Sequence, residues 1–249
     1  MEVIQNGVHV ISLIIEGLCS LTISYLVYKS FKKYQIRKNQ PTFDLSVSFL
    51  NFGIAIWLIA LGKYFDFFSS YDAITERSYS DLGLNLSFIF LALANIWLAK
   101  FVTLVFMKDN SKFLVYYAVL NGITIGLFLP YVNTQPGSYR SLMLYVVFHV
   151  MISIPFYIMI VNFCNRESKN TTEKLGKVGF RLISLFAVFL MLIFVFTGLD
   201  SVLTEYNIGT EITGLTIAYY LLWVCTLLSI FFGYLGYMMP DWLRKRLSD

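Results

Sequence analysis

The sequence predicts an all-α integral membrane protein, a bundle of seven transmembrane helices with its N-terminus outside and its C-terminus in the cytoplasm. Hydrophobic residues make up 57% of the 249 residues and charged residues 14%, whereas roughly a quarter of an ordinary soluble domain is charged. The mean hydropathy is +0.68. At about 20 apolar residues per span plus connections, we expect about seven spans and no folded soluble domain beside them.

Seven apolar stretches separated by polar breaks are the predicted spans. They cover residues 8–28, 45–68, 82–107, 113–131, 142–163, 178–199 and 212–238. Residues 1–239 are therefore the predicted seven-helix domain. Residues 240–249 are a predicted short basic cytoplasmic tail at the membrane interface, where Pro240 ends the last helix, Trp242 suits the headgroup layer, and three cations suit anionic lipid.

The connecting loops alternate in charge, and this alternation predicts the orientation. The first, third and fifth loops are basic, with five, two and four lysines or arginines at 29–38, 108–112 and 166–177. The second loop is acidic, with Asp72, Glu76 and Asp81, and so is the sixth, with Asp200, Glu205 and Glu211. Because cytoplasmic loops are enriched in Lys and Arg, the basic set is assigned to the cytoplasm.

Glu16 is the most informative single residue, because an ionisable group at the centre of a spanning helix costs at least ~2.5 to 3.5 kcal/mol. Counting from the outer end of the first span places Glu16 near the bilayer centre, and Ser12, Ser20 and Ser24 share its helix face. This polar face is expected to point into the bundle. A protonated Glu16 that only joins two helices by a hydrogen bond is the structural alternative.

Three more polar residues are expected at a similar depth: Asn95 in the third span, Asn121 in the fourth and His149 in the fifth. Together with Glu16 they are the predicted ligand or proton site. A Glu16–His149 pair would suit proton exchange, a cationic ligand or pH sensing, because histidine titrates near neutrality. A neutral His149 held by a tyrosine or a backbone carbonyl is an equal alternative.

An outer mouth to this site is predicted from His9, Asp81, Asn85 and Tyr145. Its mildly acidic character favours a cation or a polar solute over an anion. Pro155 removes a backbone hydrogen bond from the fifth helix and is the predicted hinge, just inward of the site.

Two lysines and two glycines within the spans receive structural interpretations. Lys63 and Lys100 are expected to extend their side chains to the headgroups. Gly122 and Gly126 form a small-xxx-small pair, which usually indicates close helix packing inside one bundle and less often a dimer face.

Several functions lack the residues they require. The seventh stretch has no lysine for a retinal Schiff base, and two distant histidines do not suit a multi-histidine zinc hydrolase. No Gly-x-Ser-x-Gly run is present. We therefore predict no enzyme, no catalytic residue, no metal and no cofactor. Nucleic-acid binding is not expected, because the basic residues lie in short loops beside spans.

The topology resembles that of seven-helix receptors in architecture only. The third helix ends in FMKDN where the common receptor family has an Asp-Arg-Tyr type motif, and the seventh reads YLGYMMPDW without Asn-Pro-x-x-Tyr. Descent from that family is not supported, and fold analogy gives only a weak indication of sensing.

Three functions remain open for a multi-pass protein of the cell membrane. The first is a receptor-like or sensory protein that binds a small ligand in a polar mid-membrane pocket and acts through a separate cytoplasmic protein partner. The second is a small proton- or cation-coupled transporter or channel. The third is an integral subunit or assembly factor of a membrane complex. The lipid bilayer is the partner common to all three, and the sequence also allows a homo-oligomer.

Overall fold

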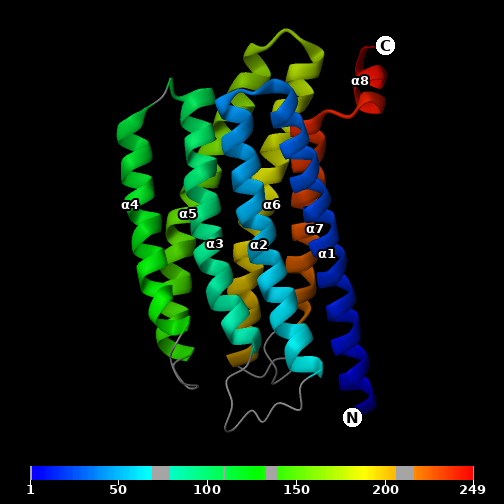
Figure 1. The fold of residues 1–249 in the computed structure, drawn as a ribbon, viewed down its shortest axis with the longest axis vertical. Helices are drawn as coiled ribbons and strands as arrows, with labels where there is room; N and C mark the ends of the chain where they lie inside the picture. Colours follow the sequence, from blue (N-terminus) through cyan, green and yellow to red (C-terminus); the bar gives the residue numbers. More distant parts are fainter. Residues whose placement is uncertain (1, 69–78, 109, 133–138, 206–215, 249) are drawn as a thin grey trace. The chain divides into compact units, whose positions relative to one another are not determined.

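A computed structural model describes residues 2–68, 79–108, 110–132, 139–205 and 216–248 (Figure 1). Within its helices, the side chains at 2–9, 81, 131, 132, 139–144, 201, 204, 205 and 248 lie outside the description. Every regular element among the described residues is helical. The elements are α1 (Glu2–Arg37), α2 (Gln40–Phe68), α3 (Tyr79–Phe106), α4 (Ser111–Phe128), the 3-10 helix η1 (Leu129–Val132), α5 (Tyr139–Asn170), α6 (Lys174–Glu205), α7 (Ile217–Met238) and α8 (Asp241–Ser248).

The prediction of seven long apolar helices is confirmed. α1 to α7 are each long and apolar enough to cross a membrane, and no strand occurs in the described part of the chain. The chain is therefore a multi-pass membrane protein by the length and composition of its helices. Which end faces the cytoplasm stays a prediction.

The helices extend beyond the predicted apolar stretches, so the basic loops are shorter than expected. α1 continues through the first basic segment to Arg37, and α5 continues to Asn170. The polar turns stay helical because a helix that leaves hydrocarbon satisfies its own backbone hydrogen bonds. Lys38, Lys108 and Met239 have φ of 48°, 49° and 49°, which is the left-handed conformation that commonly ends a helix.

Contacts divide the chain into two compact units, each described here by itself. The N-terminal unit covers residues 13–152 and contains most of α1, all of α2, α3, α4 and η1, and the first part of α5. The C-terminal unit covers residues 1–12 and 153–249 and contains the rest of α5 with α6, α7 and α8.

Small residues set the helix contacts within the N-terminal unit. α2 and α3 lie side by side (Figure 1), and a Cβ atom added at Gly62 would lie 2.5 Å from the carbonyl oxygen of Tyr79. One added at Gly83 would meet the carbonyl of Leu58. Here two backbones touch, which only glycine permits.

The other glycine pair does not have the predicted role. Gly122 and Gly126 on α4 are exposed, and a Cβ added at either would meet nothing within 4 Å. The expectation that this pair packs closely inside the bundle is therefore wrong. The same spacing occurs whether a glycine faces a neighbouring helix or the outside, so spacing alone does not tell the two apart.

In the C-terminal unit, α6 packs against α7, and α8 also contacts α6. Gly236 of α7 approaches Leu182 and Ile183 of α6, where an added Cβ would lie 3.0 Å from each. Asp200, expected in the sixth loop, instead lies buried in α6, and its carboxylate accepts a hydrogen bond from Thr216, the residue that caps the start of α7.

Candidate functional site

Glu16 forms an ion pair with a lysine of the neighbouring helix. The Nζ atom of Lys63 on α2 lies 3.2 Å from Oε1 of Glu16, whose side chain is fully buried, whereas that of Lys63 is 19% exposed. The Tyr64 hydroxyl donates to the carbonyl of Leu13 at 2.9 Å. Gly17 leaves room for that hydroxyl, since a Cβ there would lie 2.9 Å from it. These contacts bring α1 close enough to α2 for the pair to form.

This ion pair corrects the interpretation of Lys63. Its side chain was expected to extend to the headgroups, but the ammonium lies against a buried carboxylate. A buried charge needs a partner of opposite sign. Nothing in the local sequence indicates the pairing, because the two residues lie 47 positions apart and their meeting depends on the register of α1 against α2.

A second carboxylate–lysine pair joins α2 to α3. Nζ of Lys100 lies 3.2 Å from Oδ1 of the fully buried Asp44, which also accepts a hydrogen bond from Nε2 of Gln40 at 2.7 Å. The ammonium lies 4.9 Å from the centroid of the Trp97 ring. Lys100 was expected to extend to the headgroups, and its ammonium instead pairs with Asp44 near the start of α2. Asp44 was not among the predicted residues because the predicted span began one residue later.

His149 belongs to an aromatic cluster. Its ring meets the ring of Phe88 on α3 edge-on, with centroids 5.7 Å apart. Phe88 stacks on Phe128 of α4 at 4.7 Å, and Phe128 contacts Tyr145 of α5 at 6.3 Å. His149 is fully buried in this setting. Tyr145, predicted to lie at the outer mouth, therefore lies in the same cluster as His149.

Asn95 and Asn121 lie level with each other on α3 and α4. The heights of the two asparagines follow from the stacked Phe88–Phe128 pair, which joins α3 to α4. Asn95 is seven residues after Phe88, and Asn121 is seven residues before Phe128 on the antiparallel helix. Seven residues are two helical turns, which keep the same face. Both side chains are fully buried. Asn121 donates from Nδ2 to the Tyr117 carbonyl at 2.9 Å, and its Oδ1 accepts no hydrogen bond from any described residue.

These polar groups lie at successive heights along the direction of α2 rather than in the predicted single layer, and we call this succession the polar line. The hydroxyl of Ser48 donates to the carbonyl of Ala94, next to Asn95. Ser48 and Lys63 lie 15 residues apart on α2, or about 22 Å at 1.5 Å per residue. Glu16 beside Lys63 and Asn95 beside Ser48 are therefore not brought together. The layer prediction failed because it assumed equal depth from separate counts along each helix.

The polar line has four positions in the N-terminal unit: the Glu16–Lys63 pair, His149, the two asparagines and the Asp44–Lys100 pair. The Glu16–Lys63 pair lies toward one end of α2, and the Asp44–Lys100 pair lies 19 residues away toward the other end, about 28 Å along the helix. Gly83 of α3 lies against Leu58 of α2, and the Ala94 carbonyl of α3 accepts from Ser48 of α2. Phe88 lies between Gly83 and Ala94 on α3, so its partner His149 is level with the middle of α2. The two asparagines lie between His149 and Asp44.

The remaining predicted positions have separate outcomes. Asn85 of the outer mouth is buried in α3. The side chains of His9 and Asp81 lie outside the described residues. Pro155 lies within the continuous helix α5, three residues after Ile152, the last residue of the N-terminal unit; its role as a hinge stays a prediction. Among the described residues, no group of three or more His, Cys, Asp or Glu side chains could hold a metal ion.

No protein-family model matches this chain, and neither does any curated protein or solved structure. The seven apolar helices establish a multi-pass membrane protein.

Proposed function

We propose that this membrane protein conducts or transports protons or small cations along the polar line of its N-terminal unit. The observation that carries the proposal is the succession of Glu16, His149, the two asparagines and Asp44 over about 28 Å of α2. That length is close to the roughly 30 Å hydrocarbon thickness of a bilayer. Buried ionisable residues in spanning helices are costly and commonly mark ion pathways.

The two ion pairs act as the ends of this path. A proton that reaches Glu16 converts its carboxylate to a carboxylic acid and removes the counter-ion of Lys63. The Lys63 side chain is 19% exposed, so its ammonium can turn outward. A small cation acts in the same way by replacing the ammonium at the carboxylate. Asp44 and the more exposed Lys100 perform the corresponding step at the other end.

The groups between the ends have suitable chemistry for transfer. A neutral imidazole presents one donor and one acceptor nitrogen, so His149 can receive a proton on one side and release it on the other. The Oδ1 atom of Asn121 is an acceptor for water or for a cation. Successive positions of the polar line are about 6 to 13 Å apart along the direction of α2. A hydrogen bond is much shorter than this, so transfer between positions proceeds through intervening water.

Flux measurements in proteoliposomes test the proposal. Vesicles that enclose a pH-sensitive dye are given a proton gradient with the membrane potential clamped by potassium and valinomycin, and the experiment is repeated with sodium and potassium gradients. We expect the wild-type chain to dissipate at least one gradient, and Glu16→Gln and Asp44→Asn each to reduce that flux at least tenfold. Glu167→Gln is the matched control, because Glu167 pairs with Arg166 at a more exposed position. Wild-type flux equal to that of empty vesicles would refute the proposal.

A receptor-like or sensory function is the second candidate, and the Glu16–Lys63 pair supports it. A small organic cation that replaces Lys63 at the buried carboxylate would free the lysine and change how α1 meets α2, and a separate cytoplasmic partner would read that change. Thermal stability of the purified chain with a panel of small amines, choline included, tests this function. Stabilisation without flux that disappears in Glu16→Gln and persists in Asp44→Asn supports the receptor. A response that persists in Glu16→Gln excludes this pocket.

A further inference from the structure

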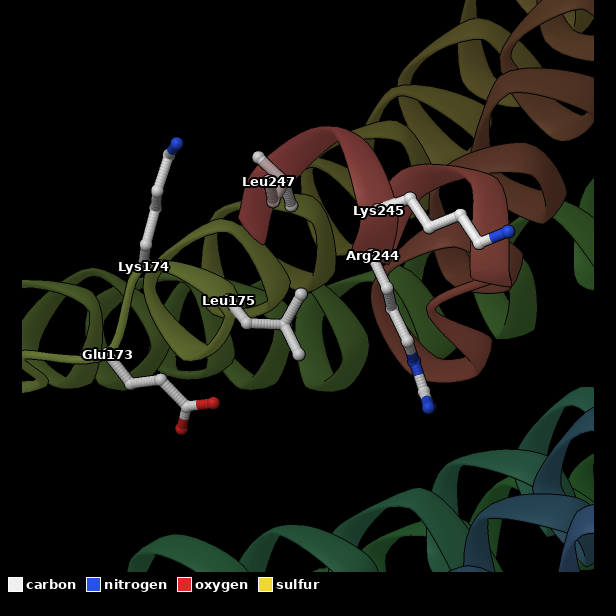
Figure 2. Close-up of a pocket in the computed structure, with 6 residues that line it drawn as sticks. All are labelled: Glu173, Lys174, Leu175, Arg244, Lys245 and Leu247. Carbon is white, nitrogen blue, oxygen red and sulfur yellow. The ribbon is translucent and has the colours of Figure 1, made fainter. Parts of the chain in front are cut away.

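The C-terminal unit has a pocket of its own, and none of its lining residues belongs to the polar line. It is open, has a volume of about 530 Å³, and lies between the start of α6 and α8. Figure 2 shows that its side chains come from both segments. The lining residues are Glu173, Lys174, Leu175, Arg244, Lys245 and Leu247.

The lining combines an apolar base with a cationic rim. Leu175 and Leu247 are partly buried, while Lys174, Arg244 and Lys245 are exposed. Figure 2 shows the two leucines between the charged side chains. Three cations and the carboxylate of Glu173 give the lining a net charge of +2 (3 − 1). This combination suits a ligand with an anionic group and an apolar part.

The pocket lies where the spanning helices end. The apolar helix α6 begins at Lys174. α7 ends at Met238, two residues before Pro240, and α8 begins at Asp241. α8 carries Trp242 beside its basic residues, with the indole 56% exposed. Tryptophan and basic residues at a helix end are typical of the headgroup layer.

We propose that this pocket binds the phosphate headgroup of an anionic phospholipid. The cations of Arg244, Lys174 and Lys245 contact the phosphate, and Arg244 supplies paired donors in the planar arrangement that phosphate accepts. The leucine base contacts the first carbons of the lipid. A free phosphate ion matches the rim but leaves the leucines without a counterpart. This site is independent of the proposed ion path.

Native mass spectrometry of the full chain in detergent tests the site. The chain is titrated with dioleoyl phosphatidylglycerol and, separately, with dioleoyl phosphatidylcholine, which has the same acyl chains and no net charge. We expect preferential binding of phosphatidylglycerol, weakened roughly five- to tenfold by Arg244→Gln and by Lys174→Gln. Arg246→Gln is the matched control, since it removes the same charge from the same helix outside the pocket.

Each outcome decides the proposal. Equal weakening by Arg244→Gln and Arg246→Gln means general surface charge and overturns it. Binding of inorganic phosphate together with equal binding of the two lipids shows a soluble-anion site instead and overturns the lipid assignment. Because Lys174 and Arg244 lie on different helices, loss in both variants with unchanged elution in size-exclusion chromatography supports a pocket formed between them and excludes misfolding of α8.

Discussion

The two carboxylate–lysine pairs use the same chemistry on one helix, α2, but differ in how they are enclosed. In both, a lysine Nζ lies 3.2 Å from a fully buried carboxylate. The side chain of Lys63 is 19% exposed, whereas that of Lys100 is 35% exposed. Asp44 also accepts a hydrogen bond from Gln40, and Lys100 lies over the Trp97 ring.

This difference indicates which pair depends more on its lysine. Lys63 pairs with Glu16 in a largely closed setting. Asp44 has a second donor, and its lysine is closer to solvent. Because an ion pair gains strength and an unpaired charge gains cost as water is excluded, the Glu16 end is the more sensitive of the two.

The largest effect is expected from Lys63→Met. This change keeps most of the side-chain volume and leaves the Glu16 carboxylate buried without its ammonium, which costs about 3 to 5 kcal/mol. Reversible unfolding in mixed micelles with increasing sodium dodecyl sulfate measures the change in free energy of unfolding. The double variant Glu16→Gln/Lys63→Met removes both charges and should recover most of the loss. If the double variant is no more stable than Lys63→Met, the uncompensated charge is not the cause.

Two glycine substitutions compare the α2–α3 contact with the α1–α2 contact, both close to the Glu16–Lys63 pair. Gly62→Ala places a methyl group 2.5 Å from a backbone carbonyl, so the helices must separate, at a cost of about 2 to 3 kcal/mol. Gly17→Ala meets only the hydroxyl of Tyr64, the far end of a side chain, and should cost less than about 1 kcal/mol. The same unfolding titration compares them, with Gly122→Ala as a control in open space. Equal losses at Gly62 and Gly17 would show that backbone contact does not set the spacing.

At the other end of α2, Lys100→Met should cost about 1 to 2 kcal/mol, less than Lys63→Met. Asp44 keeps its hydrogen bond from Gln40, so its buried carboxylate is not left without a donor. Gln40→Leu/Lys100→Met removes both donors and should approach the loss of Lys63→Met. A loss from Lys100→Met alone as large as that from Lys63→Met would contradict the difference in enclosure.

The seven spanning helices were predictable because an apolar run of this length has few structural alternatives to a membrane-spanning helix. The sequence also indicated that Glu16, Asn95, Asn121 and His149 lie inside the structure, and all four are fully buried. Charge and depth along a single helix carry that information. The roles of these residues as a ligand or proton site stay a prediction.

The pairing of Lys63 and Lys100 with buried carboxylates was not predictable, because it depends on the register between helices. Lys63 and Lys100 looked alike in sequence, each a lysine near the end of an apolar run, and both meet buried carboxylates on other helices. Asp44 lies one residue before the predicted second span and was not considered, since a carboxylate beside an apolar run resembles the end of a span. Contacts at Gly62 and Gly83 fix the α2–α3 register, and only the structure provides them.

The smallest effect is expected from Asn95 and Asn121, which lie between the two ion pairs. It tests whether these residues lie at the same height on α3 and α4. Asn95→Leu and Asn121→Leu, alone and together, form a double-mutant cycle. If the two amides face each other, the coupling energy should be about 0.6 kcal/mol, typical of polar pairs between spanning helices. Asn51→Leu with Asn121→Leu is the control cycle, since Asn51 donates to the Val47 carbonyl on its own helix. Its coupling should be near zero. Equal coupling in both cycles would mean that the loss reflects general repacking, and the path between His149 and Asp44 would then lack its amide step.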